Sequence, residues 1–175
     1  MNSRVNQFFR AITAKLGEED HAFIGRYLSP DEAELFFGMH VADQYHALKV
    51  AYTAGDFASE GNLQVDQDLL IRGALLHDIG RKKGDLDILG KVFSVLMDAV
   101  FPYISRKMAC EGNKGPFGRL RHMMFVYYNH PKIGADILRG KGLRREAEMA
   151  EKHHMPERSD DSWELRLLRR ADELN

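Results

Sequence analysis

The chain has 175 residues, 44% of them hydrophobic and 29% charged, a composition typical of one globular domain large enough to bury a core. Its net charge of −1 predicts no general attraction to nucleic acid or to anionic lipid, and no basic stripe with interleaved aromatic residues indicates nucleic-acid recognition. The single cysteine, Cys110, excludes an internal disulfide, and the absence of a signal-peptide pattern or a membrane-spanning apolar run favours a cytoplasmic protein without a membrane segment.

All the predicted elements are helices, because no segment alternates apolar and polar residues for long between turn signals. Amphipathic spacing predicts the first two helices over residues 8–16 and 18–28. The sequence Ser29-Pro30-Asp31-Glu32 is a strong start signal, with an N-cap serine, a proline at the first helical position and a glutamate that closes a capping box. It predicts a third helix that reaches about residue 39.

The fourth helix is expected to begin at Asp43 as its cap and to end at Gly55, followed by a polar loop over residues 56–64. Residues 92–104 contain the longest apolar stretch, which is too short to span a bilayer and is expected either as a lid over a pocket or as ordinary helix packing. The remaining helices are predicted at residues 65–79, 85–100, from 102 onward, 117–128, 131–139, 143–155 and 161–174.

The pair His77-Asp78 ends a segment that is otherwise fit for a protein core. Residues Leu69–Leu76 contain one charge in eight positions, which predicts a buried helix that Gly80 ends. Burying an imidazole beside a carboxylate is unfavourable unless a partner satisfies both, and a divalent cation does so. Because Arg81-Lys82-Lys83 follow, a metal at this position would favour an anionic substrate such as a phosphate.

Other metal-capable side chains fall on inner helix faces or at helix ends. A single inward histidine is more often a hydrogen-bonded core residue than a ligand, and a lone aspartate is often a capping residue. The metal-capable side chains on these faces and ends, however, are all histidines and aspartates, which bind first-row divalent metals. A shared metal site and independent core roles therefore both stay open at this point. The residues are His46, which shares a face with Val50 and Ala54, His130 before Pro131, the pair His153-His154, and Asp172 on a face with Leu165 and Leu168.

The order of these segments resembles the HD superfamily of metal-dependent phosphohydrolases, over about residues 40–175. The resemblance implies an all-α fold with one compact helical domain over residues 40–175, and a helical extension over residues 1–39 that is typical of small bacterial members. Arg81 stands where a lysine is commoner in the family. The matching segments are His46–Ala51, Ala74–Arg81 with its His-Asp-Ile-Gly signature, His130–Ala135, His153-His154 and Ala171–Leu174.

Carried over by position, the resemblance implies two divalent transition-metal ions, of iron, manganese, zinc, cobalt or nickel. Asp78 would bridge the ions and Arg81 would grip the phosphate, which makes these two the expected catalytic residues. Substrate contacts are assigned to Arg81, His154 and Lys132, although a solvated face is the ordinary place for the lysine. The implied ligands are His46, His77, Asp78 and Asp172 for the first ion, and Asp78, His130 and His153 for the second.

Two departures from the family narrow the substrate. The branch that cleaves cyclic di-GMP has a Gly-Tyr-Pro motif after its histidine pair, where this chain reads Met155-Pro156-Glu157-Arg158. Members with three metals carry a glutamate where this chain has Ala42. Both departures disfavour cyclic di-GMP and a third ion. Without that ion, His154 either contacts substrate or replaces His153 as a ligand.

The leading hypothesis is hydrolysis of a phosphate ester in a small anionic phosphorylated molecule, such as a nucleotide, by a metal-activated water. A di-iron oxygenase acting on a phosphonate or a polyol is an alternative, because the same fold and ligand set serve that chemistry. A non-catalytic signalling module is a third hypothesis, which the complete set of expected ligands argues against. The sequence predicts no nucleic-acid or membrane partner, and leaves the oligomeric state open.

Overall fold

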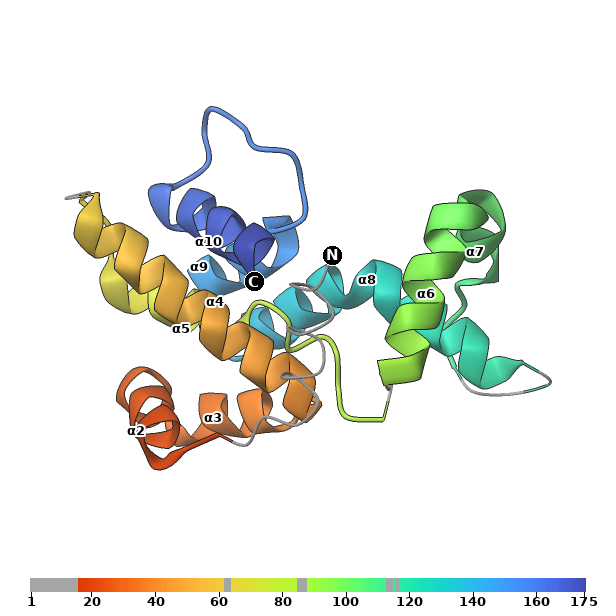
Figure 1. Cartoon of the computed structure of the whole chain (residues 1–175), viewed down its shortest axis with the longest axis horizontal. Coiled ribbons are helices and arrows are strands. Elements are labelled where there is room, and N and C mark those ends of the chain that lie inside the picture. Colours follow the sequence, from red (N-terminus) through yellow and green to blue (C-terminus); the bar gives the residue numbers. More distant parts are fainter. Residues whose placement is uncertain (1–15, 62–63, 85–87, 113–114, 116) are drawn as a thin grey trace, which may run out of the picture.

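The computed structural model describes residues 16–61, 64–84, 88–112, 115 and 117–175, and over these residues the chain forms nine helices and no strand (Figure 1). The predicted all-α fold is therefore confirmed, while the first predicted helix, over residues 8–16, lies almost wholly outside the described residues. The helices are α2 (Glu18–Tyr27), α3 (Pro30–Phe37), α4 (Val41–Glu60), α5 (Gln67–Leu76), α6 (Ile88–Val100), α7 (Pro102–Met108), α8 (Gly118–Gly140), α9 (Arg144–Lys152) and α10 (Trp163–Leu174).

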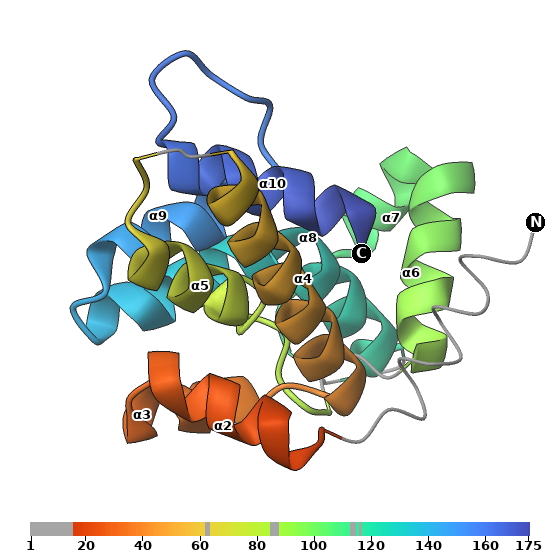
Figure 2. The same cartoon turned by 60° about the vertical axis from the view of Figure 1, so that its left-hand side comes forward.

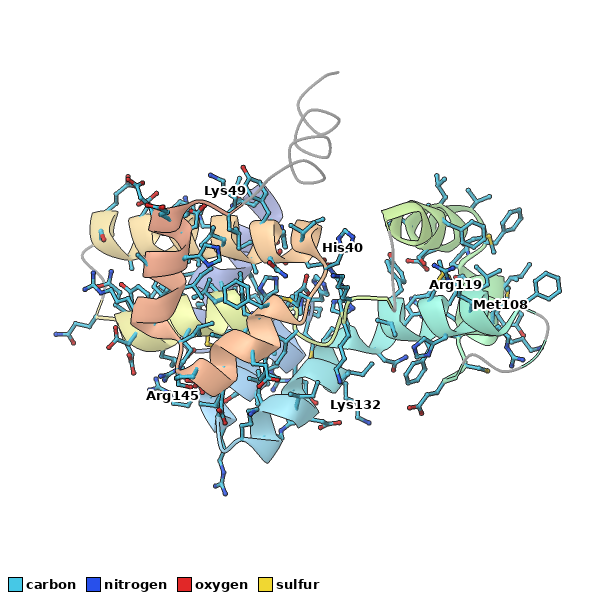
Figure 3. All side chains as sticks on the ribbon, turned by 90° about the horizontal axis from the view of Figure 1, so that it is seen from below. His40, Lys49, Met108, Arg119, Lys132 and Arg145 are labelled. Atoms are coloured by element: carbon cyan, nitrogen blue, oxygen red, sulfur yellow. The ribbon has the colours of Figure 1, made fainter. Side chains whose placement is uncertain are left out.

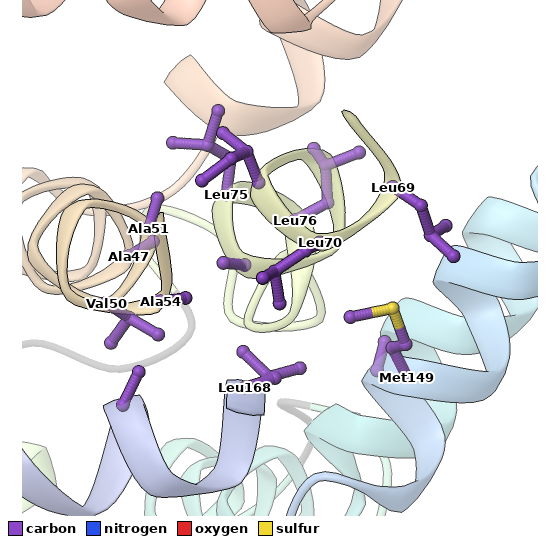
Figure 4. Close-up of a cluster of buried hydrophobic side chains, with 14 of the residues drawn as sticks. Ala47, Val50, Ala51, Ala54, Leu69, Leu70, Leu75, Leu76, Met149 and Leu168 are labelled. Atoms are coloured by element: carbon purple, nitrogen blue, oxygen red, sulfur yellow. The ribbon is translucent and has the colours of Figure 1, made fainter. Parts of the chain in front are cut away.

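Helix α5 lies at the centre of the fold, as its apolar sequence predicts. It is contacted by α4, α9 and α10, and α2 and α3 cover it on a further side (Figure 2). Seven of its ten residues are buried, and only Gln67, Asp68 and Arg72 reach solvent. Figure 4 shows Ala47, Ala51 and Ala54 of α4 beside the leucines of α5, with Leu168 of α10 and Met149 of α9 on other sides. The alanines let α4 and α5 pack closely, which fixes the end of α5.

The prediction for α4 was wrong at both ends. His40, and not Asp43, is the N-cap: its Nδ1 accepts a hydrogen bond from the Ala42 N–H at 3.2 Å. The helix also continues through Gly55 to Glu60, across the predicted polar loop. A Cβ at Gly55 would lie 3.2 Å from Ile71 Cδ1 of α5, so this glycine serves close helix packing and does not end the helix.

Helix α8 is one long helix where two were predicted, with Pro131 inside it. A proline inside a helix removes one backbone N–H, which would leave the carbonyl four residues earlier without its donor. That carbonyl belongs to Tyr127, and His130 Nδ1 lies 2.8 Å from its oxygen and donates in place of the missing N–H. The helix therefore continues through the proline, and the same hydrogen bond to Tyr127 fixes the orientation of the His130 ring.

Helices α6 and α7 make their main contacts with each other and with α8. In Figures 1 and 3 they stand beside one end of α8, apart from the bundle around α5, and Figure 3 labels Met108 and Arg119 at that end. No described residue of α6 or α7 lines the cavity discussed below, which favours helix packing over the predicted lid. None of the helices in the described part of the chain combines the length and apolar character needed to cross a bilayer.

The predicted division into an extension over residues 1–39 and a domain over residues 40–175 stays a prediction. Within the described part of the first segment, α2 and α3 both contact α5, and Ile24 and Phe36 are buried in the same core cluster as α4 and α5.

Candidate metal centre

The structure brings together all six side chains that the sequence predicted as metal ligands. They come from five places in the chain: one turn into α4, the residues after α5, the middle of α8, the residues after α9, and the last turn of α10. Groups of three whose ligand atoms lie within 4.8 Å of one another are His46, His77 and Asp172; His77, Asp78 and His153; and His130, His153 and His154.

The backbone of Gly80 lies against Gly134 of α8, and this contact allows the segment after α5 to approach that helix. Helix α5 ends at Leu76, three residues before the predicted last residue 79, and residues 77–80 form turns. A Cβ at Gly80 would lie 2.1 Å from the carbonyl oxygen of His130 and 2.8 Å from the backbone nitrogen of Gly134. Only a glycine permits this backbone contact, which places Asp78 near His130. The His-Asp-Ile-Gly segment therefore needs its glycine so that its backbone can contact the backbone of α8.

Three histidine rings are oriented in the same way, each by the carbonyl three residues earlier in the chain. At the ends of α5 and α9 such carbonyls have no helical N–H partner. In α8, Pro131 lacks the N–H that would bond the Tyr127 carbonyl, so that carbonyl is free as well. A carbonyl only accepts, so each ring carries its hydrogen on Nδ1 and leaves a lone pair on Nε2, the form that binds metal. The Nδ1-to-oxygen distances are 2.8 Å for His77 to Ala74, 2.8 Å for His130 to Tyr127 and 2.6 Å for His153 to Ala150.

These lone pairs converge on Asp78, whose side chain is 2% exposed. Asp78 Oδ1 lies 3.4 Å from His130 Nε2 and 3.7 Å from His153 Nε2, whereas Oδ2 lies 3.7 Å from His77 Nε2. Among the described residues, His77 Nε2, His153 Nε2 and Asp78 Oδ1 have no hydrogen-bond partner. Buried acceptors that face one another are unfavourable unless a cation lies between them. The donor set therefore fits a divalent transition metal.

His46 differs from the other three histidines. Its Nε2 lies 2.9 Å from Asp172 Oδ1, and because an ionised carboxylate only accepts, Nε2 carries the hydrogen here. Burial would raise the pKa of Asp172, but the hydrogen bond from His46 and the nearby His77 hold that pKa well below its ordinary value. Binding a metal through His46 Nε2 therefore requires the other tautomer of the ring.

The electrostatics of the cluster keep Asp78 charged and His130 and His153 neutral. Burial would raise the pKa of Asp78, but the guanidinium of Arg81 holds it well below its ordinary value. Burial and then Arg81 lower the pKa of His130 well below its ordinary value, and burial with neighbouring His77 lowers that of His153 to about 3. Neutral imidazoles and an ionised carboxylate bind a metal without first releasing protons.

Arg81 lies directly against two of the expected ligands. Its Nη1 is 2.6 Å from Asp78 Oδ2, and its Nη2 donates to His130 Nε2 at 2.8 Å. Nη1 is also 3.7 Å from Oδ1 of Asp43, a buried residue that was predicted only as a helix cap. The sequence contained a signal for Asp43, which precedes His46 by three residues and so shares its helix face. The guanidinium thus holds positive charge where a second cation would lie.

His153 and His154 face different surroundings. The side chain of His153 is fully buried, whereas that of His154 is 50% exposed and its Nδ1 lies 3.9 Å from Asp172 Oδ2. Burial lowers the pKa of His154 as well. Both rings belong to one group of potential ligands with His130. The burial of His153 and the exposure of His154 favour the first as a ligand and the second as a contact to substrate.

A cavity of about 560 Å³ adjoins the cluster, between the segment after α9 and α10. Arg166, Arg169 and Arg170 line it together with His154 and Asp172. Arg166 forms an ion pair with Glu157 at 2.9 Å and Arg169 one with Asp161 at 2.6 Å. The guanidinium of Arg170 lies 4.4 Å from the centre of the Phe57 ring. The sequence reasoning missed these arginines, because the amphipathic pattern of α10 explains them as a solvated face.

Lys132, predicted to contact substrate, is exposed on α8 and is not among the residues that line this cavity (Figure 3). Its predicted role has no support from the position of its side chain.

A family model described as the HD domain matches residues 44–175. The chain belongs to the HD domain family. The match covers all six predicted ligands, and HD domains bind divalent metals and are generally metal-dependent phosphohydrolases. The resemblance drawn from the sequence is thereby confirmed for the superfamily, while the two-metal branch and a bacterial source stay predictions. Comparison with curated proteins and with solved structures gave no match.

Proposed function

We propose that this HD domain protein is a metal-dependent phosphohydrolase that acts on a small phosphorylated molecule. One observation supports the proposal above the others. Buried Nε2 lone pairs of His77 and His153 and an oxygen of Asp78 converge without a hydrogen-bond partner among the described residues. A cavity whose lining includes three arginines and three carboxylates opens beside them. A metal centre next to arginines is suited to an anionic substrate.

The proposed ligands divide around Asp78, because its two oxygens face different histidines. When bound, a divalent ion supplies a Lewis acid that lowers the pKa of water and offsets charge on the phosphoryl group. Asp78 contributes by staying ionised, since its pKa is held low, and by fixing the spacing between the two halves of the site. We assign His46, His77, Asp78 and Asp172 to the first ion, and Asp78, His130 and His153 to the second.

Arg81 is proposed to bind the phosphate of the substrate. Its guanidinium has a planar fork of donors that matches two oxygens of a phosphate or a carboxylate. In the structure this fork is directed at Asp78 Oδ2 and His130 Nε2. A second cation bound by His130 Nε2 would displace the guanidinium from that atom, and a phosphate beside it would then receive the same donors. His154, half-exposed next to the cluster, would hydrogen-bond the leaving group.

The size and charge of the cavity indicate the kind of substrate. A volume of about 560 Å³ falls within the range of about 300–1,000 Å³ that is common for small-molecule sites. Arg170 lines the cavity and presents a cation to it. It would accommodate an anionic group of the substrate, and a nucleotide has such groups.

The proposal is tested by a phosphate-release screen of phosphorylated metabolites, run on protein reconstituted separately with Mn²⁺, Fe²⁺, Co²⁺, Ni²⁺ and Zn²⁺. We expect at least one metal form to release phosphate, and His130→Ala to abolish the release. His122→Ala is the matched control, because His122 lies on the same helix outside the cluster and should keep full activity.

The di-iron oxygenase alternative is tested in parallel by oxygen consumption of the iron form, reconstituted without oxygen and then exposed to it with phosphonates and polyols. Oxygen consumption without phosphate release would refute the phosphohydrolase proposal. Equal phosphate release by His130→Ala and the wild type would refute the assigned site.

A further inference from the structure

The segment from α6 to α7, residues 88–108, which we name the α6–α7 hairpin, has an inverted polarity. Of its described side chains, only Ser94 and Ser105 are buried. Its large apolar side chains face solvent instead, with Leu96 57% and Val100 62% exposed. Seven of the thirteen large apolar side chains that are exposed in the described part of the chain belong to this hairpin: Phe93, Val95, Leu96, Val100, Phe101, Tyr103 and Ile104.

Polar contacts hold the inner side of the hairpin against α8. The hydroxyl of Tyr128 on α8 donates to Asp98 Oδ1 at 2.6 Å and contacts the Ser105 hydroxyl, which also bonds the Pro102 carbonyl at 3.0 Å. Burial and the hydrogen bond to Asp98 raise the pKa of Tyr128. Asp98 and Ser105 of the hairpin are thus hydrogen-bonded inside the protein while its apolar groups face out. Monomeric soluble proteins rarely expose a large contiguous apolar surface, so this face is suited to an apolar partner.

Exposed cations lie on α7 and on the start of α8, next to the apolar face. Arg106, Lys107, Arg119 and Arg121 are all exposed on the hairpin or on the adjoining start of α8. Residues 88–125 contain six Lys and Arg against two Asp and Glu, a balance of +4 in a chain whose net charge is −1. One of the two acidic residues, Asp98, is turned inward to Tyr128. The overall charge therefore hides a basic region that coincides with the apolar one.

We propose that the α6–α7 hairpin binds the surface of a bilayer that contains anionic lipid. Apolar side chains of an interfacial helix enter the boundary between headgroups and acyl chains, and flanking cations are attracted to anionic headgroups. Both features occur here on one protruding element. A second copy of the chain is a poorer occupant, because face-to-face pairing would bring two basic rims together. The hairpin lies on the membrane and does not span it.

The test is sedimentation of the full chain with sucrose-loaded vesicles, of phosphatidylcholine alone or of equal parts phosphatidylcholine and phosphatidylglycerol. We expect binding to the mixed vesicles only. Leu96→Asp should weaken the partition coefficient by about tenfold or more, because it places a charge on the inserted face. Leu174→Asp is the matched control: this leucine is 60% exposed on α10, outside the hairpin, and its replacement should leave binding unchanged.

Charge is tested with a second matched pair. Lys107 and Arg26 both lie over a tyrosine ring of their own helix, at 5.7 and 5.4 Å, but only Lys107 is in the basic region. Lys107→Glu should weaken binding several-fold and Arg26→Glu should not, and high salt should weaken wild-type binding.

No sedimentation of the wild type, or equal sedimentation of Leu96→Asp, would overturn the proposal. The proposal would also be overturned if light scattering showed a wild-type dimer that Leu96→Asp dissociates, and if vesicles bound neither protein. That result would assign the apolar face to a second copy of the chain.

Discussion

Replacing Arg81 by methionine tests how the metal centre and its neighbouring cation are related. Methionine keeps the unbranched apolar stem and removes the guanidinium, which contacts Asp78 at 2.6 Å and His130 at 2.8 Å. The His130 contact uses the Nε2 atom that the second metal ion requires, whereas the Asp78 contact uses Oδ2, the oxygen that faces His77 of the first-ion set. The second ion therefore has to displace Arg81 from His130, and removing the guanidinium also frees the Asp78 oxygen on the first-ion side.

The size of the effect follows from what the second ion has to break. A hydrogen bond to a charged group contributes about 1.5–3 kcal/mol to stability. The Arg81 side chain is 19% exposed and that of Asp78 only 2%, so solvent screens this contact weakly. Because about 1.4 kcal/mol corresponds to a tenfold change in a dissociation constant, the second ion should bind Arg81→Met about tenfold to 100-fold more tightly than the wild type. Affinity for the first ion should also rise, because the Asp78 oxygen that Arg81 contacts faces His77.

Isothermal titration of the metal-free protein with Mn²⁺ measures both steps. Lys82→Met is the matched control, because Lys82 is the exposed neighbour and its removal subtracts the same charge without touching the ligands. An Arg81→Met protein whose second step is unchanged or weaker than that of the wild type would refute the reasoning. So would an equal gain in Lys82→Met, which would show a general effect of net charge.

Three further predictions concern the glycine contact, pH and the cavity. Gly80→Ala should lower the free energy of unfolding by several kcal/mol in urea titrations, because its Cβ would meet the His130 backbone at 2.1 Å. Gly25→Ala is the control: its Cβ would meet no atom within 4 Å, so the change should be neutral or stabilising, and equal effects of the two substitutions would contradict the packing argument. The pKa of His153 is about 3 in the folded state, below the ordinary value near 6.5, so only the unfolded state gains its proton as pH falls through 6.5. Metal-free protein should therefore lose about 2 kcal/mol of stability between about pH 7 and pH 5 from this residue alone, and a flat profile of melting temperature would contradict this. Arg170→Ala should raise KM about tenfold with little change in kcat, because Arg170 lines the cavity away from the reacting atoms; a loss confined to kcat would count against this placement.

The convergence of the metal-capable residues could be predicted because they share a simple property. His46 and Asp172 lie on inward helix faces, and His77 and His153 follow the last residue of a helix, so a bundle that buries its apolar faces brings them toward one interior. The wrong boundaries had local causes. Gly55 and Pro131 usually end helices, but tertiary contacts override that tendency here: close packing on Ile71 for Gly55 and a side-chain donor for the carbonyl before Pro131.

Contacts between distant side chains could not be read from the sequence. The pairing of Arg81 with Asp78 and His130 depends on the close approach of Gly80 to α8, which sequence spacing does not encode. The orientation of α6 was also hidden, because its apolar residues predict burial, and only its packing against α8 shows that Ser94 faces in and Leu96 faces out. The local excess of Lys and Arg over residues 88–125 was hidden for a related reason, since the net charge of the whole chain does not show where the charges lie.

Metal uptake by the purified protein shows whether the histidines and carboxylates of these five segments bind metal. Metal-free wild type, His77→Ala and His122→Ala would each be dialysed against Mn²⁺ and Zn²⁺ and analysed for bound metal per chain. We predict one to two ions in the wild type and in His122→Ala, and a loss of at least one ion in His77→Ala, whose Nε2 faces both Asp78 and Asp172. A wild type that retains no metal, or a His77→Ala protein that retains as much as the wild type, would contradict the account.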